Sequence, residues 1–364
     1  MKKAEDVRLA LVFKDFAAWI RTSCVGLNVA GFTTAQVLRE YGVDVTVFPV
    51  RHNVDIVHAV DKYNETHDKP LTHVVISAPW LSLHDLKSLV KNFKDIEFVI
   101  LSHSNVGFLQ ADPEGVELLR KYQELSEKYP NLKVGGNSER FVEWFEKAYE
   151  REAVLLPNLY PLTYQRQKEP WDGVSPIKIG AFGAVRPEKN FMTATAAAVL
   201  IQKELQVPVE FHMSSGGEGD QGRVSPAIGQ MTDNIPGFTL VRHNWQPWDQ
   251  FIHLVSSMDL LIQVSYTESF NMVTADGVLA GVPSVVSSAI YWAPDSWKAD
   301  ADDAVEISEV GINLLLRDDA AIQGTKALIK HNKRSIEKWF HFLYGKKENF
   351  FERLIKFFRY TEPF

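Results

Sequence analysis

The sequence has 364 residues, a length that suits two domains of moderate size. Hydrophobic residues make up 45% of the chain, charged residues make up 23% and the net charge is -7, so the overall balance argues against a protein dedicated to binding nucleic acid. A single cysteine, Cys24, excludes an intramolecular disulfide and a multi-cysteine zinc site.

The first half of the chain alternates between short apolar segments and longer segments with helical spacing. Strands are expected at 7–13, 43–48, 73–77, 97–101, 132–135 and 153–156. Helices are expected near 28–41, 53–65, 82–93, 113–129 and 138–150. Apolar strands that alternate with helices form parallel sheets covered on both faces, so residues 1–160 are predicted to be an α/β domain.

Residues 157–176 carry four prolines and little periodicity, which is typical of a linker. The alternation then resumes. Strands are expected at 177–182, 209–213, 239–242, 260–264 and 284–286. Helices are expected near 190–205, 247–257, 271–280 and 318–331. Residues 161–344 are therefore predicted to be a second α/β domain.

The segment between the strand expected at 260–264 and the helix expected at 271–280 is the most informative about chemistry. The backbone amides of Phe270, Asn271 and Met272 are expected at the amino end of this helix, where an anion such as diphosphate is favoured. Glu268 precedes the helix, and Asp276 lies five residues inside it, where a carboxylate suits the paired hydroxyls of a ribose. The alternative is that Glu268 only caps the helix and Asp276 faces solvent.

The segment after the strand expected at 177–182 contains Gly183, Arg186 and Lys189. It lies at the carboxyl end of that strand, where open α/β sheets bind ligands. The two cations would neutralise a leaving diphosphate, Arg186 through its bidentate guanidinium and Lys189 as a point charge. For Arg186, a solvated charged turn is the alternative.

The predicted first domain offers two candidate residues. Gly26 lies in a short loop before the helix expected at 28–41, and such a loop allows a phosphate to approach the backbone. His103 lies at the end of the strand expected at 97–101, although a single histidine is also compatible with a structural role. The neighbouring Cys24 is expected to fill space rather than to act as a nucleophile.

These segments resemble, in chain order, the pattern of family-four retaining glycosyltransferases, which have the GT-B fold of two Rossmann-like domains facing across a cleft. Glu268 and Asp276 have the family's separation, and Gly281-Val282-Pro283 matches its Gly-x-Pro turn. Matches to the family's diphosphate-binding loop are Gly183, Pro187, Glu188 and Lys189. The chain departs from the pattern, which usually has Gly, Arg, Gly and Glu, at Val25, Ala184, Asn271 and Asp276.

The resemblance implies that the chain transfers a hexose from a nucleotide sugar, most simply a UDP-sugar such as UDP-glucose, with retention of anomeric configuration. It also implies that no cofactor, bound metal or side-chain nucleophile takes part. Asp276 would hold the ribose, and Glu268 would contact the sugar or the adjacent phosphate. His103 resembles a family histidine that faces the donor sugar, and Gly26 matches the second of two family glycines in the first loop.

The acceptor stays open among a saccharide, a lipid-linked saccharide, a hydroxymethylated DNA base and a small metabolite. Basic and aromatic residues after Lys326 would support peripheral contact with a membrane or with nucleic acid. The alternative is that residues 345–364 form a helix that packs back on the first domain. No signal-peptide pattern begins the sequence, so a cytoplasmic or peripheral membrane location is expected. A sugar-nucleotide epimerase of the same fold and a non-catalytic nucleotide-binding partner are the competing functions.

Overall fold

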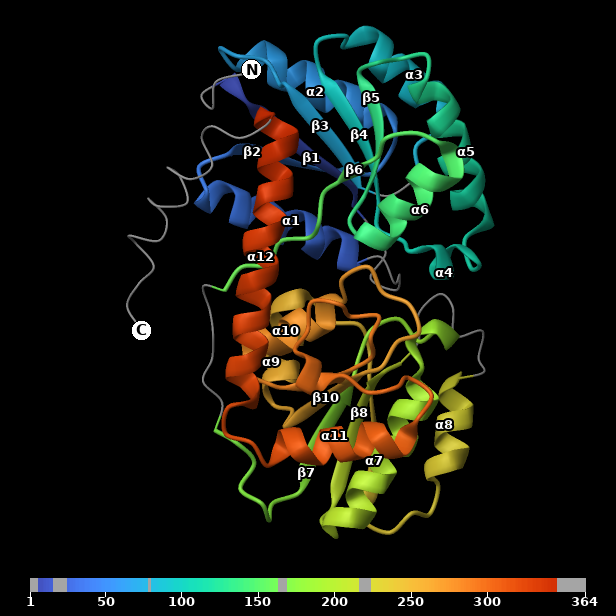
Figure 1. The fold of residues 1–364 in the computed structure, drawn as a ribbon, viewed down its shortest axis with the longest axis vertical. Coiled ribbons are helices and arrows are strands. Elements are labelled where there is room, and N and C mark those ends of the chain that lie inside the picture. The colour runs from blue at the N-terminus through green and yellow to red at the C-terminus, as the bar shows by residue number, and fades with distance from the viewer. Residues whose placement is uncertain (1–5, 16–24, 78–79, 163–168, 216–223, 346–364) are drawn as a thin grey trace. The chain divides into compact units, whose positions relative to one another are not determined.

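Two parallel β-sheets, each at the centre of its own unit, organise the chain (Figure 1). The structure is a computed structural model that describes residues 6–15, 25–77, 80–162, 169–215 and 224–345. Of these, 6–15, 26–161 and 332–345 belong to the first unit, and the described residues from 162 to 331 belong to the second. The prediction of an α/β chain with two Rossmann-like sheets is confirmed.

The first sheet has six strands in the order β2-β1-β3-β4-β5-β6, and all neighbours are parallel. The strands are β1 (Arg8–Lys14), β2 (Asp44–Val50), β3 (His73–Ser77), β4 (Glu97–Ser102), β5 (Leu132–Gly136) and β6 (Val154–Leu155). Every residue of β3 is buried, because helices cover both faces of the sheet.

Different helices build the two apolar layers of this unit. One face packs against α2 (Val54–Thr66), α3 (Leu83–Asn92), α5 (Pro113–Ser126) and α6 (Glu139–Tyr149). The other face packs against α1 (Val25–Glu40) and the C-terminal part of α12 (Ala320–Tyr344). A single turn, α4 (Val106–Leu109), follows β4.

Helix starts in the first unit follow from local sequence. Ser82 accepts a hydrogen bond from the Asp85 amide at the start of α3, and Ser138 accepts one from the Phe141 amide at the start of α6. Asp112 caps α5 in the same way, with Pro113 as the first helical residue. Such caps satisfy amides that have no partner inside the helix, so they fix where each strand-to-helix loop ends.

The second sheet has five strands in the order β11-β10-β7-β8-β9. They are β7 (Ile177–Ala181), β8 (Val209–Ser214), β9 (Phe238–His243), β10 (Leu260–Gln263) and β11 (Ser284–Val286). The helices are α7 (Phe191–Leu205), α8 (Val224–Thr232), α9 (Trp248–Ser256), α10 (Met272–Ala280) and α11 (Ala304–Leu315), with 3-10 turns η2 (Pro187–Lys189) and η3 (Asp295–Trp297).

Helix α10 packs unusually close to β10. Residues 274–280 of this helix are all buried, so neighbouring segments cover it on every side. A Cβ atom on Gly277 would lie 2.7 Å from a methyl carbon of Leu261 on β10, which explains a glycine inside a helix. This close approach fixes the amino end of α10 at the carboxyl end of β10.

Three differences from the expected elements stand out. Helix α1 begins at Val25, so Gly26 lies in its first turn and not in a loop, which corrects the expectation for that residue. Helices α4, α8 and α11 were not predicted. Helix α12 runs on to Tyr344, where Gly345 adopts a φ of 74° and ends it.

The extension of α12 has a clear physical cause. Its apolar side chains beyond residue 331, including Ile336, Trp339 and Leu343, recur with helical spacing and are buried in the first unit. The packing expected for residues 345–364 cannot be compared with the structure, because 346–364 lie outside the described residues. Among the described helices, none is both long and apolar enough to cross a membrane.

Candidate active site

Lys189 and Glu268 meet at the carboxyl edge of the second sheet. Lys189 ends the turn η2 after β7, and Glu268 lies between β10 and α10. Because β7 and β10 are parallel neighbours, the loops that follow them meet at the same edge. The Lys189 Nζ atom lies 2.5 Å from Glu268 Oε1, and the two side chains are only 19% and 10% exposed.

The Glu268 carboxylate accepts two more hydrogen bonds at the same oxygen. Ser265 Oγ and Asn271 Nδ2 each donate to Oε1 over 2.8 Å. Three donors therefore fix the orientation of this carboxylate. Glu268 is not the cap of α10, so this part of the alternative interpretation is wrong.

Asn271 caps α10 instead. Its Oδ1 accepts hydrogen bonds from the Thr274 amide at 2.8 Å and from the Thr274 hydroxyl at 2.9 Å. Its φ is 67°, in the left-handed region where glycine and asparagine are the residues most easily accommodated. This explains how Asn can stand where the resembling family usually has Gly.

The backbone between Glu268 and α10 is held from outside the loop. The Trp292 indole Nε1 donates a 2.6 Å hydrogen bond to the Phe270 carbonyl, and the two rings stack with centroids 5.4 Å apart. Met272 is the first residue of α10. Residues 270–272, whose amides were expected to face an anion, thus lie at the start of the helix with Trp292 as a fixed support.

Asp276 is buried within α10, at 3% exposure, so the alternative that it faces solvent is wrong. Its Oδ1 accepts a 2.9 Å hydrogen bond from Nε1 of Trp248, the first residue of α9. Trp248 was not among the residues predicted for the site. An aromatic residue at the start of a helix was the available signal, but nothing local pairs it with an acid 28 residues away.

Gly183 and Arg186 border the lysine. Gly183 has a φ of 119°, which side chains rarely adopt, and its amide donates to Ser214 Oγ at 3.1 Å. A Cβ atom on Gly183 would lie 4.0 Å from Cε of Lys189, so the loop passes close to that side chain. Arg186, partly buried, is the extended residue that precedes η2.

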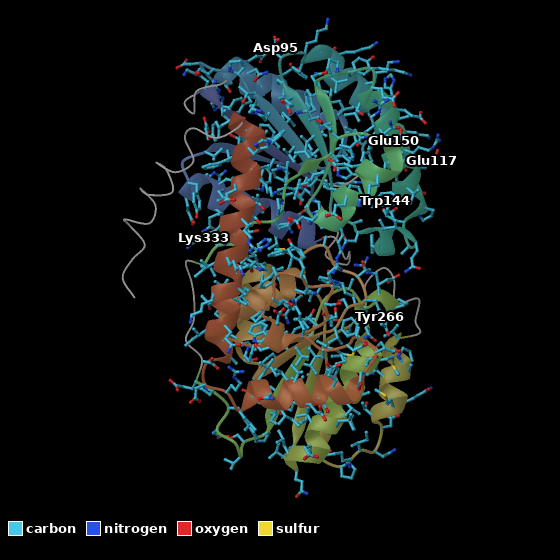
Figure 2. All side chains as sticks on the ribbon, viewed as in Figure 1. Asp95, Glu117, Trp144, Glu150, Tyr266 and Lys333 are labelled. Carbon is cyan, nitrogen blue, oxygen red and sulfur yellow. The ribbon has the colours of Figure 1, made fainter. Side chains whose placement is uncertain are left out.

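The two loops are also tied to each other through the backbone. The amide of Tyr266, a residue labelled in Figure 2, donates a 2.9 Å hydrogen bond to the carbonyl of Glu188. The side chain of Tyr266 is 53% exposed at this edge. A large exposed aromatic next to a lysine–glutamate pair is a second feature that the sequence analysis missed.

His103 follows β4 in the first unit and is partly buried. Its Nδ1 lies 3.3 Å from Nδ2 of Asn137. Burial lowers the pKa of His103 to about 4, so the ring is neutral at pH 7. The second unit holds Gly183, Arg186, Lys189, Glu268, Phe270, Asn271, Met272 and Asp276, while Gly26 and His103 belong to the first. Direct contacts join Lys189, Glu268 and Asn271.

Within the described ranges, no three His, Cys, Asp or Glu side chains are grouped so that they could hold a metal ion. No protein-family model matches the sequence, and no curated protein matches it either. The fold, by contrast, matches solved structures.

HepE from Anabaena, in complex with UDP, is 14% identical, with a TM-score of 0.60 over 92% of this chain and 99% of that one. A sucrose-phosphate synthase from Thermosynechococcus elongatus is also 14% identical, with a TM-score of 0.60 over 97% of this chain and 98% of that one. A TarM variant from S. aureus bound to UDP is 14% identical, with a TM-score of 0.55 over 74% of this chain. The match spans only 55% of the TarM chain. The protein therefore has the GT-B glycosyltransferase fold.

Proposed function

We propose that this protein is a retaining glycosyltransferase that moves a hexose from a nucleotide diphosphate sugar to an acceptor hydroxyl. The observation that supports this most is the convergence of Lys189, Glu268 and Asn271 beside the start of α10, in a GT-B fold. A UDP-sugar is the proposed donor, because HepE, which shares the fold, has been solved with UDP and with UDP-glucose. The second unit is proposed to bind the donor and the first to bind the acceptor.

Chemically, the bond between the anomeric carbon and the diphosphate oxygen breaks, and a bond to the acceptor oxygen forms on the same face of the sugar. The acceptor proton leaves with the diphosphate or passes to solvent. Negative charge develops on the leaving diphosphate, and preorganised cations and amides stabilise it at little reorganisation cost. Lys189, Arg186 and the amino end of α10 are proposed to supply this stabilisation.

The hydrogen-bond network around Glu268 gives this proposal a specific feature. Lys189 pairs with Glu268, while Ser265 and Asn271 hold the same carboxylate in place. An arriving diphosphate would compete with Glu268 for Lys189, and the two other donors would still hold the carboxylate. Asp276, with Trp248 fixing one of its oxygens, is proposed to hold the ribose.

The test is release of free nucleotide from a panel of UDP-, GDP-, ADP- and TDP-sugars. One donor is expected to be turned over slowly without acceptor, and proton NMR of the sugar product is expected to show retention. Lys189→Met and Glu268→Gln should each lower turnover by about 100-fold, the usual effect of removing one stabilising group. Lys203→Met, which removes an exposed lysine of α7, is the matched control.

The outcomes distinguish the proposed function from its alternatives. If both site variants keep wild-type turnover, the assignment of this edge as the active site fails. If a nucleotide binds but no sugar is transferred or hydrolysed, the result would favour the alternative of a non-catalytic nucleotide-binding partner. Turnover that survives EDTA would support the expectation that no metal takes part. A productive donor then allows acceptor screening among saccharides, lipid-linked saccharides and hydroxymethylated DNA.

A further inference from the structure

Two buried asparagines and a partly buried histidine follow neighbouring strands of the first sheet. His103 comes directly after β4, Asn137 directly after β5, and Asn158 three residues after the end of β6. Because β4, β5 and β6 are adjacent and parallel, these residues reach the same edge of the sheet. Asn137 is 1% exposed and Asn158 is 6% exposed, so solvent competes little for their hydrogen bonds.

The backbone of Asn137 is fixed on both sides. Its amide donates a 3.0 Å hydrogen bond to the Ser102 carbonyl at the end of β4. The next residue, Ser138, caps α6 and donates its hydroxyl proton to Oδ1 of Asn105. The Asn137 side chain therefore starts from a rigid position between a strand and a helix.

The segment that carries Asn158 is equally well held. The Pro157 carbonyl accepts a 2.8 Å hydrogen bond from the indole of Trp339, a residue of α12. On the other side, the Leu159 amide donates to Thr34 Oγ1 at 3.2 Å. Asn158 is thus a fixed neighbour against which the amide of Asn137 can be oriented.

The contacts of the Asn137 side chain determine which imidazole nitrogen of His103 carries the proton. Asn137 Nδ2 lies 3.4 Å from Oδ1 of Asn158 and 3.3 Å from Nδ1 of His103. A carbonyl oxygen only accepts hydrogen bonds, so Asn158 favours the orientation that points the NH₂ group of Asn137 toward it. An amide nitrogen only donates, so Nδ1 of His103 must accept, and a neutral ring then carries its proton on Nε2.

We propose that Asn137 is a positioning residue that holds His103 as the neutral tautomer protonated on Nε2, with Asn158 fixing the orientation of the Asn137 amide. His103 then presents a hydrogen-bond donor and not a base. Its ligand would be an oxygen acceptor such as a sugar hydroxyl, a step that rests on the proposed glycosyltransferase function. Asn137, which contacts the ring, and Asn158, which contacts Asn137, are both uncharged, and burial lowers the pKa of the ring to about 4.

The tautomer is measured directly by NMR of the full-length protein labelled with ¹⁵N on histidine. Two-bond proton–nitrogen correlations distinguish the tautomers, and His103→Asn identifies the signal among eleven histidines. The wild type should show protonation on Nε2 at pH 7. Asn137→Asp places a carboxylate at the same position, so the proton should move to Nδ1 and the pKa should rise by about one unit or more.

Matched variants separate this effect from general changes. Asn92→Asp adds the same charge at an exposed end of α3 and should leave the His103 signal unchanged. Asn158→Asp keeps an oxygen acceptor and should preserve the wild-type tautomer, whereas Asn158→Leu should give a mixture. If Asn137→Asp does not fold, the two Asn158 variants still decide the matter. Protonation on Nδ1 in the wild type, or no response to any of these substitutions, overturns the proposal.

An activity measurement tests the functional part. With the donor identified by the nucleotide-release panel, Asn137→Asp should lower kcat by about tenfold, the effect of one misplaced hydrogen bond, without changing nucleotide affinity. An unchanged kcat in a variant with the altered tautomer would overturn the functional step. If the wild type turns over no nucleotide sugar while the NMR result holds, the proposed function fails and the role of Asn137 stands.

Discussion

Asn271 has a left-handed backbone and a side chain that makes two kinds of contact. Its replacement by Gly and by Ala should separate the contributions of the backbone and of the side chain to the free energy of unfolding. Its φ of 67° is left-handed, its Oδ1 caps α10 at Thr274, and its Nδ2 donates to Glu268. Asn271→Gly keeps the backbone conformation and loses both contacts. Asn271→Ala loses the same contacts and also places a Cβ atom in the left-handed region.

The magnitudes follow from these losses. For Asn271→Gly, the missing bond to the carboxylate and the missing cap should lower the free energy of unfolding of the second unit by about 2 kcal/mol. For Asn271→Ala, the left-handed backbone adds about 1–2 kcal/mol. Asn234, exposed and also left-handed at a φ of 63°, is the control, since its replacement by Ala should cost only the backbone term.

Equilibrium urea unfolding, followed by far-UV circular dichroism and tryptophan fluorescence, measures these differences. The expected order of stability is wild type, Asn271→Gly, then Asn271→Ala. Equal stability of the Gly and Ala variants would show that the backbone at 271 is not constrained. Equal stability of the Gly variant and the wild type would show that the contacts with Glu268 and Thr274 contribute nothing.

Three further outcomes are expected. Trp292→Phe keeps the ring stack but loses the hydrogen bond to the Phe270 carbonyl, so the free energy of unfolding should fall by about 1 kcal/mol. The affinity for UDP, measured by calorimetry, should fall as well. An unchanged affinity would exclude a role for this support in nucleotide binding. Gly183→Ala places a Cβ atom at ordinary contact distance from Lys189 but at a φ of 119°, so the free energy of unfolding in urea should fall by about 1 kcal/mol. An unchanged value would show that the loop relaxes freely. For His103, the unfolded state binds more protons than the folded state between the folded pKa near 4 and the ordinary value of 6.5, so stability should fall as pH drops through this range. The free energy of unfolding should be about 2 kcal/mol lower at pH 5 than at pH 7 from this group alone, and His103→Asn should remove that part of the slope.

The sequence was informative where structure is determined locally. Buried parallel strands are apolar on both faces, so the strand pattern predicted both sheets and their positions closely. The segment from β10 to α10 was also predictable, because Glu268, Asn271 and the start of the helix are neighbours in the chain. Helix α8 was missed because Pro226 and Gly229 interrupt its sequence.

The remaining features depend on contacts between distant residues. The bonds from Trp248 to Asp276 and from Trp292 to Phe270 join residues 28 and 22 positions apart. Asn332 exchanges two hydrogen bonds with the backbone of Tyr160, 172 residues earlier, in the part of α12 where the helix had been expected to stop. No local propensity encodes such pairs, so these supports of the candidate site were not predictable from the sequence.

Helix α12 also bears on how the protein is made. The first unit needs residues from both ends of the chain, since Ile336, Trp339 and Leu343 cover the sheet face that also carries α1. During synthesis, this part of the face stays uncovered until residues 332–344 have left the ribosome. Transiently exposed apolar surface invites aggregation and chaperone binding. A nascent chain stalled before residue 332 should therefore contain every strand of its first unit and yet bind chaperones or aggregate.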